Sequence, residues 1–135
     1  MLAIWSGEPA STIGYVAAVH RWRQNNPIAY QSQISALRDT ATQCIDALGG
    51  GNTQRVLAGI EQYDRHLERL SSISGVDFYN QTHLKMRKKV ELACCTYKPS
   101  GAGGGDYGIA YSTDKEELLT LADQLKREQK DTFVL

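Results

Sequence analysis

The segment Lys98–Gly108 restricts the fold of this chain more than any other part of it. Its sequence is Lys-Pro-Ser-Gly-Ala-Gly-Gly-Gly-Asp-Tyr-Gly, and the residues on both sides of the glycines, Cys95–Tyr97 and Tyr107–Ser112, are β-prone. Two such segments joined by a glycine-rich connection predict two strands and a loop. Because glycine adopts φ > 0 and lets backbone N–H groups approach a ligand, the loop is expected to be either a flexible hairpin or an anion site.

Upstream of this loop, apolar residues at three- and four-residue steps predict helices. The expected helices run from Ser11 or Thr12 to about Gln24, from Pro27 to Gly49, from Asn52 to Gly75, and from about Phe78 to Ala93. The first of them is expected to carry its apolar face on Ile13, Val16 and Ala17. A final helix is expected after Thr113, which forms a capping box with Glu116.

Strands are also expected at the two ends of the chain, over Leu2–Ser6 and Thr132–Leu135. Four short strands and about five helices predict an α+β fold, with one antiparallel four-stranded sheet and helices packed on one face. The whole chain is expected to form one domain.

Composition excludes several function classes. Fifteen basic residues balance fifteen acidic ones, which gives no drive toward nucleic acid. The basic run Lys85–Lys89 is expected to be a solvated helix face. No apolar run approaches the ~18–20 residues of a membrane span, and no signal peptide is seen. Three cysteines, two of them adjacent, favour a reducing, cytoplasmic environment over a disulfide scaffold.

Several side chains near the glycines suit anion binding. Lys98 is either a phosphate contact or a solvated strand end, and Ser100 offers a hydroxyl donor. The segment lacks the Lys-Ser/Thr pair of a Walker A loop. Ser11 and Thr12 open the first helix, where they serve as plain N-caps or add an anion-binding helix end. His20, His66 and His83 share no ligand spacing, so no metal site is expected.

The run Lys98–Asp106 resembles the third conserved motif of the GHMP small-molecule kinases, the glycine-rich loop of their C-terminal domain. Ser-Gly-Ala-Gly-Gly-Gly-Asp is the form found in phosphomevalonate kinases. A second resemblance covers Trp5–Thr12, which is similar to the strand, turn and helix that open that domain. The order of the elements between these two motifs also agrees, so the resemblance spans nearly the whole chain.

The resemblance implies a ferredoxin-like, substrate-binding domain and a role in the ATP-dependent phosphorylation of 5-phosphomevalonate to 5-diphosphomevalonate. It assigns the acceptor to Ser100, Gly101 and Ala102, and backbone donors for the phosphates to Gly103, Gly104 and Gly105. It leaves two roles for Asp106, accepting loop N–H groups or facing the metal, and the first is favoured. ATP and Mg²⁺ are implied for the complete enzyme.

The resemblance also implies that the N-terminal, ATP-binding domain lies outside this sequence, so that no catalytic residue is expected here and the isolated chain is expected to be inactive. That domain would complete the enzyme in cis or as a separate chain. The alternative is a stand-alone module that keeps the fold and binds a small molecule or a partner without catalysis. A domain that lacks its other half is expected to expose an apolar patch through which it could form a homodimer.

Overall fold

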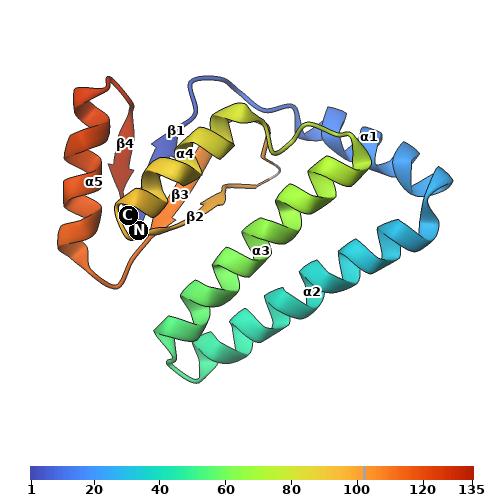
Figure 1. Ribbon diagram of the computed structural model, residues 1–135, viewed down its shortest axis with the longest axis horizontal. Coiled ribbons are helices and arrows are strands. Elements are labelled where there is room, and N and C mark those ends of the chain that lie inside the picture. The colour runs from blue at the N-terminus through green and yellow to red at the C-terminus, as the bar shows by residue number, and fades with distance from the viewer. Residues whose placement is uncertain (102) are drawn as a thin grey trace.

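The computed structural model describes residues 1–101 and 103–135, and Figure 1 shows its arrangement. Ala102, to which the resemblance assigns part of the acceptor site, lies outside the described residues. In chain order the elements are β1 (Leu2–Trp5), α1 (Thr12–Asn25), α2 (Pro27–Gly49), α3 (Thr53–Ser74), α4 (Gln81–Leu92), β2 (Thr96–Pro99), β3 (Tyr107–Tyr111), α5 (Lys115–Arg127) and β4 (Thr132–Val134).

The strands form one antiparallel sheet in the order β2-β3-β1-β4. Leu2 of β1 lies opposite Ala110 of β3 on one side and Val134 of β4 on the other, so the first strand joins the last two. Lys98 of β2 lies opposite Ile109 of β3, which makes β2 and β3 the two sides of the glycine loop. The expected α+β fold with a four-stranded antiparallel sheet is confirmed.

Two apolar cores hold the chain together. In the first, α4 and α5 pack on one face of the sheet, and Val90 and Leu121 meet Leu2 and Ile4, all of them buried. In the second, the long hairpin of α2 and α3 packs with α1 and with the segment before α4, around Leu37, Leu70, Phe78 and Tyr79. Figure 1 shows this hairpin extending away from the sheet, while α1 lies at the upper right, next to the start of α2.

The structure corrects three local expectations. The packed face of α1 is Tyr15, Val19 and Trp22, whereas Ile13 is 87% exposed and Val16 is 58% exposed. The fourth helix begins at Gln81 rather than near Phe78, because Phe78 turns into the second core and Asn80 caps the helix. The final helix is capped by Asp114, which accepts from the Glu116 N–H, so the capping box of Thr113 does not form.

Within the described residues, no helix is both long and apolar enough to pass through a bilayer.

Candidate functional site

The glycine loop lies where the two cores meet, and its glycines are required by close packing. A Cβ on Gly103 would stand 2.3 Å from the Phe78 carbonyl oxygen, and a Cβ on Gly104 would stand 2.2 Å from the Tyr15 hydroxyl. Both glycines also have φ of +75°, a region that other residues enter at a cost. The Gly104 N–H donates to the Phe78 carbonyl at 2.5 Å. The helical core therefore fixes the shape of this half of the loop.

Asp106 ties the end of the loop to the segment between β1 and α1. Its Oδ1 accepts the Ala10 N–H at 3.1 Å, and its own N–H donates to the Glu8 carbonyl at 2.8 Å. Its carbonyl accepts the Ser6 N–H at 2.7 Å, so three hydrogen bonds hold one residue. The carboxylate thus accepts a backbone N–H as favoured from the sequence, although the donor belongs to the neighbouring segment and not to the loop itself.

The start of the loop borders a cleft. Ser100 is half-buried, and its N–H donates to the Tyr107 carbonyl at 2.8 Å. Gly101 is exposed and contributes to the wall of a cavity of about 300 Å³ between α1, α2 and α3. The rest of that wall is Tyr15, Val16, Val19, His20, Tyr30, Leu67, Leu70 and Phe78. A small molecule in this cleft would meet an apolar wall, tyrosine hydroxyls and the glycine loop.

Lys98 is neither a solvated strand end nor aimed at the glycines. Its Nζ donates to the Pro99 carbonyl at 2.6 Å and lies 5.7 Å from the centre of the Tyr63 ring on α3. Burial lowers the pKa of this ammonium, and the nearby Asp64 carboxylate acts in the opposite direction. Lys98 therefore joins the loop strand β2 to the helical hairpin.

Ser11 and Thr12 lie at the exposed start of α1. Ser11 occupies the N-cap position, but its side chain makes no capping hydrogen bond. Tyr15, one turn further along the helix, covers Gly104. Tyr15 thus brings α1 into contact with the glycine loop.

Two polar residues beneath the loop were not identified from the sequence. Asn80, the N-cap of α4, donates through Nδ2 to the Gly104 carbonyl at 3.0 Å. His83, which is 0% exposed, places Nδ1 2.6 Å from the Tyr97 hydroxyl. A signal for His83 was present, because it precedes Met86 and Val90 by three and seven residues on the buried stripe of α4.

A buried ion pair lies next to His83, one turn further along α4. The Asp64 carboxylate accepts the Tyr79 hydroxyl at 2.7 Å and lies 3.2 Å from Arg87 Nη1, which also binds Glu68 at 2.7 Å. Burial raises the pKa of Asp64, while Tyr79 and Arg87 lower it. Arg87 therefore differs from the other members of the basic run, which are exposed as expected. This cluster joins α3 to α4.

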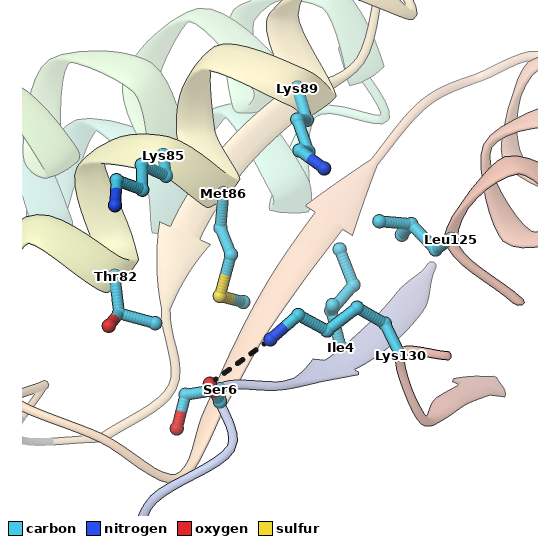
Figure 2. Close-up of a pocket in the computed structure, with 8 residues that line it drawn as sticks. All are labelled: Ile4, Ser6, Thr82, Lys85, Met86, Lys89, Leu125 and Lys130. Atoms are coloured by element: carbon cyan, nitrogen blue, oxygen red, sulfur yellow. Dashed lines mark hydrogen bonds between the residues drawn. The ribbon is translucent and has the colours of Figure 1, made fainter. Parts of the chain in front are cut away.

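A second cleft, of about 260 Å³, opens between β1, α4 and α5 (Figure 2). Lys85, Lys89 and Lys130 project around it, above a floor of Ile4, Met86 and Leu125. Lys89 is paired with Glu128, and Lys130 Nζ lies 3.5 Å from the Ser6 carbonyl oxygen. Ser6 also donates its N–H to Asp106, so this cleft adjoins the glycine loop through one residue.

The resemblance implies Mg²⁺ for the complete enzyme. In residues 1–101 and 103–135, no group of three His, Cys, Asp or Glu side chains could hold a metal ion. Asp106 Oδ1 already accepts the Ala10 N–H. In kinases Mg²⁺ is usually held by one or two carboxylates together with substrate phosphates, so it does not depend on such a cluster.

Comparison with known proteins agrees with the geometry. No family model matches the chain. A phosphomevalonate kinase from Streptomyces sp. (strain CL190) is 32% identical to it over 106 residues, which is 78% of this chain and 28% of that protein. The chain thus spans well under half the length of the relative it matches.

Solved structures match the fold over nearly the whole chain. The Lin0012 protein from Listeria innocua has a TM-score of 0.90 at 26% identity, covering 99% of this chain and 38% of that one. The Streptococcus pneumoniae phosphomevalonate kinase, solved with phosphomevalonate and AMPPNP, has a TM-score of 0.81 at 24% identity. The match covers 98% of this chain and 37% of that one. The L. major mevalonate kinase, solved with R-mevalonate, shares the fold at a TM-score of 0.83 and 19% identity. The match covers 94% of this chain and 37% of that one. The chain belongs to the GHMP kinase superfamily, as a relative of phosphomevalonate kinases that is matched over a part of their length.

Proposed function

We propose that this chain supplies the acceptor-binding domain of a phosphomevalonate kinase, and that its glycine loop holds the phosphate of 5-phosphomevalonate. The observation that carries the proposal is the position of Gly101, at the wall of the 300 Å³ cleft, in a chain 32% identical to a phosphomevalonate kinase. The S. pneumoniae relative, with the same fold, was solved with phosphomevalonate and AMPPNP.

The proposed reaction moves the γ-phosphoryl group of ATP to a phosphate oxygen of 5-phosphomevalonate, giving ADP and 5-diphosphomevalonate. Such a transfer depends mainly on positioning and on stabilisation of negative charge. In this chain the loop from Ser100 to Gly105 would provide a hydroxyl and backbone N–H donors for the acceptor phosphate. The exposed start of α1, at Ser11 and Thr12, would add the positive end of a helix dipole.

The same proposal assigns the nucleotide, its Mg²⁺ and the residues that drive the transfer to an N-terminal domain, in cis or in trans. The share of each relative that the chain covers, 28% to 38%, leaves room for such a domain. Ile13 and Val16 lie on the uncovered side of α1, and Val16 also borders the cleft. We propose that the other domain covers this face of α1 and closes the cleft.

Calorimetric titration of the purified chain with 5-phosphomevalonate tests the acceptor role. Mevalonate serves as the ligand control, because it lacks only the phosphate. Ser100→Ala should weaken binding about tenfold or more, the value of one hydrogen bond to a charged group. Ser32→Ala, an exposed serine on α2, is the matched control and should bind as the parent chain does.

Binding that requires both the phosphate and Ser100 would support the proposal. Equal affinity for mevalonate and 5-phosphomevalonate would show that the loop does not hold the phosphate. No heat with either ligand at millimolar concentration would overturn the claim that this chain carries a formed acceptor site.

A further inference from the structure

The start of α4 lies beneath the glycine loop and carries two polar side chains there, the half-buried Asn80 and the buried His83. Asn80 uses both ends of its amide: Oδ1 accepts the His83 N–H at 3.1 Å and caps the helix, while Nδ2 donates to the Gly104 carbonyl at 3.0 Å. The helix cap and the loop contact are therefore made by one side chain. If the cap is fixed, the position of the Gly104 carbonyl is fixed with it.

His83 is the second polar group under the loop. Its Nδ1 lies 2.6 Å from the buried Tyr97 hydroxyl. A Cβ added to Gly108 would stand 2.1 Å from the same hydroxyl oxygen. Its Nε2 is buried and, among the described residues, has no partner at hydrogen-bond distance. An unpartnered buried polar atom is costly and calls for a reason.

Burial lowers the pKa of His83, and the Gly105 backbone and the charges of Glu8 and Asp106 act in the opposite direction. A tyrosine hydroxyl that donates to Nδ1 leaves the proton of the neutral ring on Nε2. The Nε2–H would then be a donor facing the loop.

Holding the Gly104 carbonyl determines where the N–H of the next residue points. A trans peptide is planar, and its C=O and N–H point in opposite directions. In the next peptide, the Asp106 N–H donates to the Glu8 carbonyl at 2.8 Å, in the segment between β1 and α1. By the same rule, the Gly104 carbonyl held by Asn80 directs the Gly105 N–H away from α4, and no described residue accepts it.

We infer that Asn80 and His83 are positioning residues: Asn80 holds the Gly104 carbonyl and so directs the Gly105 N–H toward a bound anionic oxygen, and His83 supports the loop from beneath by fixing Tyr97 against Gly108. The identity of that oxygen, a phosphate oxygen of the acceptor, rests on the proposed function. The clamp itself rests on the contacts of Asn80, His83 and Tyr97. Both residues act through the loop backbone and need not touch the ligand.

Asn80→Ser separates the clamp from the helix cap. Serine is a good N-cap, so α4 should keep its start, but the short side chain no longer supplies the amide donor to Gly104. The matched control is Asn52→Ser, since Asn52 caps α3 by accepting from the Arg55 N–H and lies far from the loop in the chain. His83→Asn keeps an acceptor for the Tyr97 hydroxyl but lacks an equivalent of Nε2. His83→Gln restores a donor near the position of Nε2.

Two readouts are needed. The first is amide hydrogen exchange without ligand: Asn80→Ser and His83→Asn should speed exchange of the Gly104 and Asp106 N–H groups about tenfold or more, as expected for a loosened loop, and Asn52→Ser should not. The second is the affinity for 5-phosphomevalonate, which should fall about five- to tenfold in the same two variants and recover in part in His83→Gln. Circular dichroism confirms that each variant is folded.

Unchanged exchange in Asn80→Ser relative to Asn52→Ser would overturn the clamp. Faster exchange with unchanged affinity would overturn the link between the clamp and the anion. If the parent chain binds no 5-phosphomevalonate but the exchange rates change as expected, the proposed function fails while the clamp stands.

Discussion

The ring of Tyr15 on α1 covers Gly104 so closely that a Cβ at position 104 would stand 2.2 Å from the Tyr15 hydroxyl and 2.3 Å from two of its ring carbons. This contact joins residues that are far apart in the chain and fixes the glycine loop to the helical core. It also makes the loop sensitive to changes on α1, which is the first of the consequences that can be measured.

Gly104→Ala should lower the free energy of unfolding by roughly 2–4 kcal/mol, because overpacking against Tyr15 adds to the strain of φ +75°. The measurement is urea denaturation followed by tryptophan fluorescence. Gly101→Ala is the control: its φ is +63°, but no described atom lies within 4 Å of the added Cβ. That variant should lose only about 1–2 kcal/mol. Equal losses in the two variants would show that the Tyr15 contact costs nothing.

Asp106→Asn should leave stability nearly unchanged, because the amide oxygen can still accept the Ala10 N–H and asparagine tolerates the φ of +55° at this position. Asp106→Ala loses the acceptor and should cost about 1–2 kcal/mol. Thermal unfolding of the two variants measures the difference. A large loss in Asp106→Asn would mean that the negative charge, and not the hydrogen bond, holds the loop.

Arg87→Gln should destabilise the chain by about 3–5 kcal/mol near neutral pH, since it leaves the buried Asp64 carboxylate without its cationic partner. The loss should shrink as the pH falls, because Asp64 can then be protonated. Arg65→Gln is the control, since this arginine pairs with Glu61 and Glu91 in solvent and should contribute at most about 1 kcal/mol. Denaturant titration at several pH values measures the free energy of unfolding of both variants. Near neutral pH, Arg87→Gln should be the less stable of the two.

His83 should make stability fall as the pH is lowered. Burial lowers its pKa in the folded chain, whereas the unfolded chain binds the proton at about pH 6.5. Below that pH the unfolded state gains a proton that the folded state resists, so the free energy of unfolding decreases. The difference between the parent and His83→Gln should therefore narrow from pH 7.5 to pH 5. The control is His20→Gln, at an exposed position, and its free energy of unfolding should change with pH as that of the parent does. The same pH dependence in the parent, His83→Gln and His20→Gln would contradict the prediction.

The isolated chain should self-associate through the uncovered side of α1. Ile13 is 87% exposed and Val16 is 58% exposed on the same helix face, and burying apolar surface favours association. Light scattering should show a mass that rises with protein concentration in the parent and less so in Ile13→Glu. Ile45→Glu, an exposed isoleucine on α2, should behave as the parent does.

Local signals predicted most of the fold. Pro27 begins α2, Gly75 ends α3 in a left-handed conformation with φ +67°, and the β-prone segments beside the glycines form the paired strands β2 and β3. These features depend on the backbone preferences of nearby residues. The helix α4 was misplaced at its start because the burial of Phe78 depends on residues of α1 and α3, which no local pattern reveals.

The position of the glycine loop could be predicted from the sequence, but the residues that pack against it could not. The glycine composition of the loop pointed to a tight backbone, yet the atoms that require it belong to Tyr15, Phe78 and the carbonyl of Glu8, all distant in sequence. The apolar residues of α1 were recognised, but the side that packs was not, because the amphipathic pattern of α1 is weak and its tyrosine and tryptophan pack against the helical core.

The pairing of β1 with both β3 and β4 has a consequence for how the chain folds as it is synthesised. β1 is made before both of its neighbours in the sheet, β3 and β4, and Leu2 lies opposite Val134. The hairpin of α2 and α3 involves only nearby residues and can form early. The complete sheet, and with it the strands that anchor the glycine loop, must wait until β4 has left the ribosome. Until then β1 lacks a neighbouring strand along at least one of its edges.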